Sequence, residues 1–195
     1  MMPLLIQGDA RRIPLKDESV DMILTSVPFK DEDVEGDYWE FYDLIFKEMY
    51  RVSRKCLAII NTPTRINELA IRYPPKRWII WGKGIIAPAW RFNPILIYQK
   101  NGYKVNKYIW SDTIGIAPIK GSNKIHKYQD PTELYKVLIK MFKDCQLIFD
   151  PFGGSGTCAV ACMELKRDFI GLEIIPEYNE LAKKRLSGTQ IKMIV

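Results

Sequence analysis

The chain has 195 residues, of which 47% are hydrophobic and 27% are charged, as in one globular domain rather than a disordered or coiled-coil chain. No apolar run approaches the ~18 residues that cross a bilayer, and the apolar stretch at the start is too short for a secretory signal, so we expect a soluble, intracellular (cytoplasmic) protein with no membrane partner. One histidine and four cysteines without a C-x-x-C pair exclude a zinc site of standard ligand spacing, and we expect no metal.

Hydrophobic patterns predict strands and helices in alternation. In chain order the predicted elements are strand 3–9, strand 19–26, helix 38–52, strand 56–61, strand 77–81, strand 94–100, helix 130–142, strand 145–150, helix 157–166, strand 168–173 and helix 176–186. The first helix has large side chains at helical spacing, at Trp39, Tyr42, Phe46 and Met49. The second is expected to begin with Asp130 at its N-cap and Pro131 at its first helical position.

Almost continuously apolar strands that alternate with helices predict an α/β fold, in which helices cover both faces of a mostly parallel central sheet. Ligands of such sheets bind at the carboxyl ends of the strands. Three predicted strands end in polar or glycine-rich turns, at Asp9, Ser26 and Asp150. We expect the functional site where these ends meet.

The net charge of +6 favours a polyanionic partner. Between residues 100 and 127, aromatic side chains alternate with six lysines: Lys100, Lys104, Lys107, Lys120, Lys124 and Lys127. Lysines that contact phosphates and rings that stack on bases are typical of nucleic-acid surfaces; a solvated lysine face is the alternative. Residues 31–43 carry seven acids and no base, and we expect a loop held away from phosphates.

A glycine-rich loop follows the strand that ends at Asp150, in the sequence DPFGGSGT, and Glu173 ends the next strand. Glycines let a backbone approach a ligand closely, and an acid at the next strand end suits ribose hydroxyls. The loop is neither a G-x-G-x-x-G fingerprint nor a P-loop. The extra acid at Asp150 suits a ligand with an ammonium group, and S-adenosylmethionine combines an ammonium, a sulfonium and a ribose.

Four segments in one order resemble the motifs of DNA amino-methyltransferases. DPFGGSGT and FIGLEIIPEYNELAKKRL are similar to that family's DPFxGSGT and GxExxxxYxxxAxxRL patterns. HKYQDPTELYKVLI resembles its HPTQKPxxLxxxLI segment, and IQGDARRIPLKDESVDMILTSVPF resembles its GD…SVDLIxTSPPY segment. The resemblance covers residues 4–60 and 126–186 and implies a Rossmann-like, S-adenosylmethionine-dependent methyltransferase fold.

The order of the motifs resembles the permuted β-group of that family, with the target-amine motif first and the cofactor loop last. In that group the recognition region lies between them. We therefore expect a single methyltransferase domain over residues 1–195, with a small target-recognition region within about residues 61–125. DNA-binding lysines are expected at Lys100, Lys104, Lys107, Lys120 and Lys124.

The resemblance also implies roles for individual residues. The catalytic motif is Ser26, Val27, Pro28 and Phe29: the serine Oγ and the Val27 carbonyl accept the hydrogens of an exocyclic amine while positive charge develops on it, and the Phe29 ring stacks on the flipped base. Asp150 is expected near the methionine amino group, Glu173 at the ribose and Asp9 at the adenine amino group. The full cofactor set comprises Asp9, Ala10, His126, Gln129, Asp150, Pro151, Phe152, Gly153, Gly154, Gly156, Thr157, Glu173 and Ile174.

Two residues depart from the family pattern. Val27 replaces the first proline of SPPY, so the carbonyl acceptor is kept but the φ restraint is lost. Asp130 stands where the family often has lysine, which puts cofactor contacts rather than the fold in question.

Three functions follow as alternatives. The first is site-specific methylation of double-stranded DNA at N4 of cytosine, which Ser26 favours within the resembling family, or at N6 of adenine. The second is methylation of a structured RNA, against which the motif order argues. The third is an inactive cofactor- or DNA-binding module, suggested by Val27. The chain could act as a homodimer. A cognate nuclease of a restriction-modification system would be a separate chain, because no nuclease motif is visible in this sequence.

Overall fold

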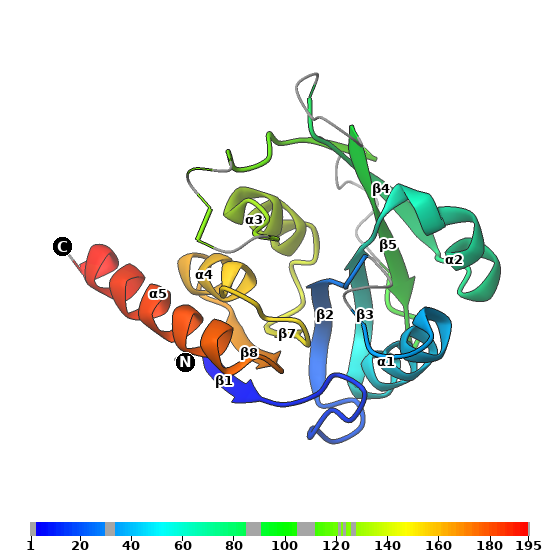
Figure 1. Ribbon diagram of the computed structural model, residues 1–195, viewed down its shortest axis with the longest axis horizontal. Coiled ribbons are helices and arrows are strands. Elements are labelled where there is room, and N and C mark those ends of the chain that lie inside the picture. The colour runs from blue at the N-terminus through cyan, green and yellow to red at the C-terminus, as the bar shows by residue number, and fades with distance from the viewer. Residues whose placement is uncertain are drawn as a thin grey trace.

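The computed structural model describes residues 3–29, 34–84, 91–104, 112–120, 122, 124–125 and 128–194, with side chains to residue 189. In this part of the chain eight strands form one sheet in the order β1-β8-β7-β2-β3-β5-β4-β6 (Figure 1). The strands are β1 Leu4–Gln7, β2 Val20–Ser26, β3 Ser53–Ile60, β4 Arg77–Gly82, β5 Phe92–Gln99, β6 Thr113–Gly115, β7 Leu147–Asp150 and β8 Asp168–Glu173. Each neighbouring pair is parallel except β3–β5 and β4–β5, so β5 alone runs against the others within the described sheet, and the predicted mostly parallel sheet is confirmed.

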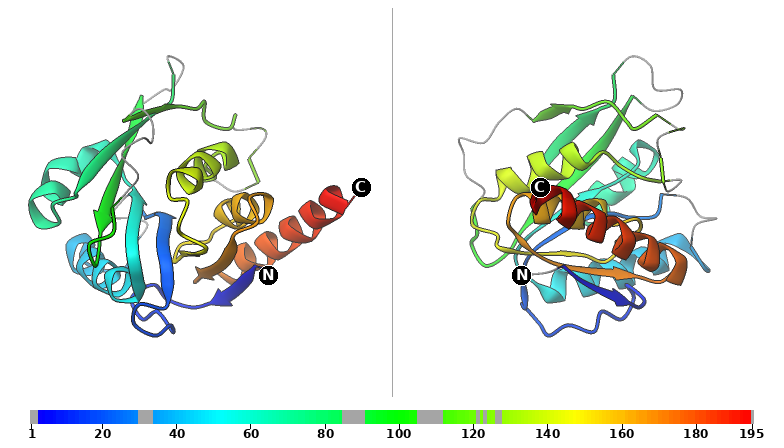
Figure 2. Two further views of the ribbon diagram at one scale, coloured as in Figure 1. Left: turned by 180° about the vertical axis from the view of Figure 1, so that it is seen from behind. Right: turned by 90° about the vertical axis from the view of Figure 1, so that its left-hand side faces the viewer.

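Helices cover both faces of the sheet, as the sequence predicts. They are α1 Tyr38–Val52, the short 3-10 helix η2 Pro63–Arg65, α2 Ile66–Arg72, α3 Thr132–Met141, α4 Thr157–Glu164 and α5 Pro176–Ile194. Successive strand side chains point to opposite faces, so Met22 and Leu24 pack with α3 and α4, whereas Ile23 packs with α1. Figure 1 shows α3 and α4 on one side of the sheet and α1 and α2 on the other, and Figure 2 shows α5 running beside β1 and β8.

Helix α1 begins and ends where the pattern predicts. Its N-cap is Asp37, whose carboxylate accepts hydrogen bonds from the backbone N–H groups of Trp39, at 2.8 Å, and Glu40, at 2.9 Å, a cap that commonly contributes about 1 kcal/mol. Tyr42 and Met49 are fully buried, whereas Trp39 and Phe46 are half-buried. The expected loop over residues 31–43 is wrong from residue 38 onward, because the capped helix begins there; residues 31–33 lie outside the described part.

The start of α3 differs from the prediction. The helix begins at Thr132, its N-cap is Pro131 with an extended backbone, and no side chain caps it. Asp130 therefore does not cap the helix, because the extended backbone at Pro131 (φ −65°, ψ 135°) moves the start of the helix one residue beyond the predicted position.

Other elements had no clear sequence signal. β6 has three residues and α2 has seven, too few for a period to be read from the sequence. Helix α5 continues to Ile194, beyond the predicted end at residue 186. No helix among the described residues is long and apolar enough to cross a membrane.

Candidate active site

The carboxyl ends of four neighbouring strands meet at one edge of the sheet. β1, β8, β7 and β2 are adjacent and parallel, so the residues that follow them lie side by side. The Thr25 hydroxyl donates to Asp150 Oδ1 at 2.6 Å and joins the ends of β2 and β7. The backbone N–H of Gly8 donates to the Glu173 carbonyl at 3.0 Å and joins β1 to β8. The three strand ends named from the sequence thus form one site.

The glycine loop between β7 and α4 has a fixed shape. The N–H of Gly153 donates to the Leu172 carbonyl at 2.8 Å, and the N–H of Gly156 donates to the Gly153 carbonyl at 2.8 Å. Gly156 is the N-cap of α4 and has a φ of 77°, which non-glycine residues rarely adopt. A Cβ atom there would lie 3.0 Å from the Cβ of Ala182 in α5. Glycine is therefore required at residue 156 by both backbone and packing.

Glu173 holds the loop from the end of β8. Its Oε2 accepts from the N–H of Gly154 at 2.8 Å, and its Oε1 accepts from the N–H of Ile175 at 2.9 Å. A carboxylate has about four acceptor sites, so these bonds leave capacity for a ligand's hydroxyl groups. The Ile174 side chain beside it is 56% exposed, which makes it an apolar surface next to the carboxylate.

Asp150 is a buried carboxyl group at the end of β7. Burial raises its pKa to about 7, with a further contribution from the charges of Glu173 and Asp130, although the bonds from Thr25 and from the N–H of Phe152 lower it. The ionised form is therefore short of positive charge in this structure. A cation beside Asp150 would stabilise it.

Asp9 follows β1 and is bound by Arg11. Its carboxylate accepts from the backbone N–H and the Nε of Arg11, both at 2.8 Å. Burial alone would raise the pKa of Asp9, but these bonds and the charge of Arg11 lower it. Asp9 is thus an ionised acceptor near the end of β8.

The predicted catalytic motif begins at Ser26, the last residue of β2. The N–H of Val27 donates to the Ile60 carbonyl at 3.4 Å, a weak bond that proline in this place could not make. The Pro28 carbonyl accepts from the Tyr38 hydroxyl at 3.1 Å. Phe29 is partly buried against the cores on both faces of the sheet. The motif is therefore anchored to β3 and α1, which compensates in part for the missing proline.

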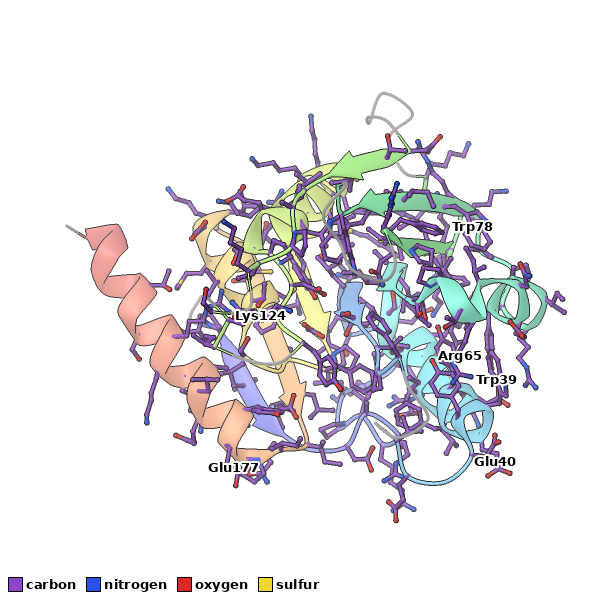
Figure 3. All side chains as sticks on the ribbon, turned by 45° about the horizontal axis from the view of Figure 1, so that its top comes forward. Trp39, Glu40, Arg65, Trp78, Lys124 and Glu177 are labelled. Atoms are coloured by element: carbon purple, nitrogen blue, oxygen red, sulfur yellow. The ribbon has the colours of Figure 1, made fainter. Side chains whose placement is uncertain are left out.

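An arginine reinforces this anchor. The guanidinium of Arg65 lies 3.8 Å from the ring centroid of Tyr38 and 5.8 Å from that of Trp39, within the range of cation–π attraction. Figure 3 shows Arg65 next to Trp39. Tyr38 in turn holds the Pro28 carbonyl, so this pair supports the motif from the side of α1 and η2.

Asp130 lies against the first residue of the motif. The hydroxyls of Ser26 and Tyr135 and the charges of Lys83 and Lys124 act on the pKa of its carboxyl group. Burial raises the pKa of Asp130 to about 6 in spite of these contacts, all of which lower it. Lys83 follows β4, which runs in the same direction as β3, and therefore lies at the same sheet edge as Ser26.

The remaining candidate residues are divided between the site and other places. Gln129 is buried, and its Oε1 accepts from the N–H of Ile125 at 2.9 Å, so it shapes the segment before α3. Ala10 is buried, and so is Pro151, at the start of the glycine loop. His126 and Lys107 lie outside the described residues.

The expected DNA-binding lysines do not form one surface. Lys100 follows β5, and its end of the strand pairs near the start of β3, so it lies at the opposite sheet edge. Its ammonium donates to the carbonyls of Tyr50 and Ser53, at 2.9 and 2.8 Å, and its side chain is 9% exposed. Lys104 and Lys120 are exposed. Lys124 acts on Asp130, and Figure 3 shows it on the other side of the sheet from Trp39.

Several residues that support the site were not predicted from the sequence. Arg185 of α5 donates to the Ser155 carbonyl at 3.2 Å, to the Thr157 hydroxyl at 3.0 Å and to the Thr132 hydroxyl at 3.2 Å, so it ties the glycine loop to α3. It is the arginine of the KKRL segment, whose position in the family pattern was the available signal. Thr25, one of two buried polar residues that precede Ser26 in β2, and Tyr135 were not predicted either.

The mostly parallel sheet, the glycine loop after β7 and the carboxylate that ends β8 define a Rossmann-like α/β protein with a nucleotide-type site at the carboxyl ends of its strands. A family model described as DNA methylase matches residues 71–184, more than half of the chain. The chain belongs to this N6/N4 DNA methylase family.

Individual relatives agree with this assignment. The chain is 34% identical over 113 residues to the type II methyltransferase M2.MboI of Moraxella bovis, a match that covers 55% of this chain and 40% of that protein. The match thus spans less than half of that relative's length. A crystal structure of the M1.HpyAVI–SAM complex superposes with a TM-score of 0.70 at 25% identity, over 94% of this chain and 100% of that chain.

The PvuII DNA methyltransferase (cytosine-N4-specific) superposes with a TM-score of 0.79 at 15% identity, over 97% of this chain and 91% of that chain. At this identity the likeness concerns the fold alone. The predicted Rossmann-like methyltransferase fold is confirmed.

Proposed function

We propose that this chain is an S-adenosylmethionine-dependent, site-specific DNA methyltransferase that acts on an exocyclic amino group, with N4 of cytosine favoured and N6 of adenine as the alternative. The observation that carries the proposal is the 2.6 Å hydrogen bond between Thr25 and Asp150. It joins the strand that delivers Ser26 to the strand that delivers the glycine loop. An acceptor for the target amine therefore lies next to a carboxyl group suited to a ligand's ammonium. Family membership and the structural likeness to the M1.HpyAVI–SAM complex support the same conclusion.

The residues at the strand ends fit S-adenosylmethionine. Asp150 is a buried carboxyl group with a raised pKa, and an ammonium beside it would supply the missing positive charge. Glu173 retains acceptor sites for ribose hydroxyls, and the exposed Ile174 offers an apolar surface for an adenine ring. Asp9 offers an acceptor for the adenine amino group. The bound cofactor would supply an activated methyl group.

The chain's own residues would prepare the amine for methyl transfer. The lone pair of an exocyclic amine is delocalised into the base ring, and it becomes nucleophilic as the nitrogen becomes tetrahedral. Ser26 Oγ and the Val27 carbonyl would accept the two amino hydrogens and stabilise the charge that develops on the nitrogen. The Phe29 ring would stack on the base, which must leave the duplex to enter the pocket. Ser26 favours cytosine because serine is commoner in this place among the N4-cytosine enzymes of the resembling family.

Double-stranded DNA is the proposed substrate. The net charge of +6 favours a polyanion, and Lys124 lies near the site, with the exposed Lys120 a few residues before it. We assign target recognition to residues 61–125, although β4, β5 and β6 within this range belong to the central sheet. A homodimer would enlarge the contact area, and a cognate restriction nuclease would be a separate chain.

The test is transfer of label from methyl-labelled S-adenosylmethionine to duplex DNA, with a structured RNA as the competing substrate. We expect label in DNA and none in RNA. Ser26→Ala should lower the single-turnover rate by about 100-fold or more without changing cofactor affinity. The matched control is Ser19→Ala, just before the start of β2, where the hydroxyl donates a hydrogen bond to the Lys16 carbonyl. The single-turnover rate of this variant should equal that of the wild type. An unchanged rate in Ser26→Ala would exclude the catalytic assignment, and label in RNA alone would exclude the substrate.

A further inference from the structure

The Val27 carbonyl is the acceptor in the proposed amine site that belongs to the backbone. Its direction depends on the torsions around the peptide that joins Val27 to Pro28, since each peptide unit is planar. The ring of Pro28 fixes φ at that residue, whereas Val27 has no ring to restrain its own φ. The hydrogen bonds on either side of this peptide therefore decide where the acceptor points.

Two hydrogen bonds hold the peptides that flank the Val27 carbonyl. Before it, the N–H of Val27 donates to the Ile60 carbonyl at 3.4 Å, which is long for such a bond. After it, the Pro28 carbonyl accepts from the Tyr38 hydroxyl at 3.1 Å. Within the described residues no donor binds the Val27 carbonyl itself. This acceptor is thus open to a ligand, and the shorter of the two bonds that restrain it comes from Tyr38.

Tyr38 is itself held in place at the start of α1. Its side chain is 4% exposed and packs in the same apolar cluster as Val27. The guanidinium of Arg65 lies 3.8 Å from the centroid of its ring, and the ring centroid of Tyr42 lies 6.0 Å away. Arg65 belongs to η2, which follows β3 in the chain. The hydroxyl of Tyr38 therefore acts from a fixed ring.

We propose that Tyr38 is a positioning residue for methyl transfer, which keeps the Val27 carbonyl directed at a hydrogen of the target amine by holding the next peptide. This inference rests on the proposed function. It assigns to a side chain of α1 the restraint that a proline at residue 27 would supply through its ring. The hydroxyl of Tyr38 and a proline at residue 27 should therefore substitute for one another.

The test is a double-variant cycle on the single-turnover rate with duplex DNA at saturating cofactor. Tyr38→Phe keeps the ring and loses the hydroxyl, so the rate should fall about tenfold to 100-fold, as expected for a misplaced acceptor. The DNA concentration that gives half of the maximal rate should stay at the wild-type value. In a Val27→Pro background the same substitution should cost less than about threefold, because the proline ring already restrains the motif.

Tyr98→Phe is the matched control. Tyr98 packs in the same apolar cluster, is 6% exposed, and donates its hydroxyl hydrogen to the Tyr73 carbonyl, also at 3.1 Å. The bond that this variant loses has the same chemistry, length and burial as that of Tyr38, but it does not touch the motif. Both variants should lose a similar amount of Tm, whereas Tyr98→Phe should keep the wild-type rate.

A second measurement depends neither on methyl transfer nor on the folding of the Val27→Pro variants. In the ligand-free protein, the amide hydrogen of Val27 should exchange about fivefold faster in Tyr38→Phe than in the wild type, as the loss of one hydrogen bond implies. NMR follows this exchange residue by residue. In Tyr98→Phe the Val27 amide should exchange at the wild-type rate.

The outcomes separate the positioning role from the proposed function. An equal fall in rate with valine or proline at residue 27, an unchanged rate in Tyr38→Phe, or unchanged exchange of the Val27 amide would overturn the positioning role and leave methyl transfer standing. No label in DNA with the wild-type protein would overturn the proposed function and the role of Tyr38 in it, whereas the exchange rates would still report whether the hydroxyl holds the motif.

Discussion

Replacement of Asp150 by asparagine should stabilise the ligand-free protein at neutral and alkaline pH while weakening cofactor binding. The buried carboxyl has a pKa of about 7 in the folded chain, against 3.8 for the ordinary group. Because the folded-state pKa is the higher one, the fold binds more protons than the unfolded chain between these values. Wild-type stability should therefore fall as the pH rises from about 4 to about 7. Asparagine keeps an oxygen that can accept from Thr25 and Phe152 but is neutral at every pH.

The size of the effect follows from the shift. A difference of about 3 pKa units corresponds to about 4 kcal/mol at 1.36 kcal/mol per unit. The asparagine amide must itself be desolvated, at a cost of about 1–3 kcal/mol, so we expect a net gain of about 2 kcal/mol at pH 8. For a chain of this size that is about 5 °C in Tm.

The assay is thermal or urea unfolding of both proteins at a series of pH values, together with cofactor titration. The difference in stability should grow from about pH 4 to pH 7 and then level off. At pH 8 the variant should bind S-adenosylmethionine more weakly because the ammonium loses its counter-charge. A stability difference that does not change with pH, or a variant that is less stable than the wild type at pH 8, would refute the reasoning about the buried charge.

Two other substitutions test the glycine loop. Gly156→Ala places a side chain at a φ of 77° with its Cβ 3.0 Å from that of Ala182, so Tm and cofactor affinity should both fall. The control is Gly102→Ala, at a φ of 71° with open space around it, which should lose only the conformational part of the stability, about 1–2 kcal/mol. Equal losses of stability in the two variants would contradict the argument that Gly156 is crowded by Ala182. Arg185→Met keeps an unbranched apolar side chain but removes the three hydrogen bonds by which Arg185 joins the loop to α3. Cofactor binding should therefore weaken about tenfold, as expected for the loss of a buried hydrogen-bond network. Wild-type affinity in isothermal titration would mean that the loop holds its shape without the arginine.

Much of the fold was predictable because its elements carry strong local signals. Helix α1 has both the 3.6-residue period and a cap at Asp37, and β2 is buried at every residue except its last. That Ser26 and Asp150 lie at the same edge of the sheet followed from the rule that parallel strands share a carboxyl edge. These inferences need only the residues of one segment and a general rule of sheets.

The rest depended on contacts between distant segments. β5 pairs antiparallel with β3, and β4 and β6 extend the sheet beyond β5. The apolar composition of a strand does not encode which strand it pairs with or in which direction. Asp130 met the sequence criteria of a helix cap, but the extended backbone at Pro131 makes Pro131 the N-cap and starts the helix at Thr132. Lys100 belonged to a basic stretch, yet the direction of β5 carries it to the opposite edge, where backbone carbonyls bind it.

Nucleoside mass spectrometry tests the central claim most directly. Duplex DNA of mixed sequence is incubated with the protein and methyl-labelled S-adenosylmethionine, then digested to nucleosides. The account predicts labelled N4-methylcytosine. Labelled N6-methyladenine would support the amino-methyltransferase activity and show that the target base is adenine instead of cytosine. If the protein binds the cofactor but the digested DNA contains no labelled nucleoside, the claim that this site methylates DNA would be contradicted.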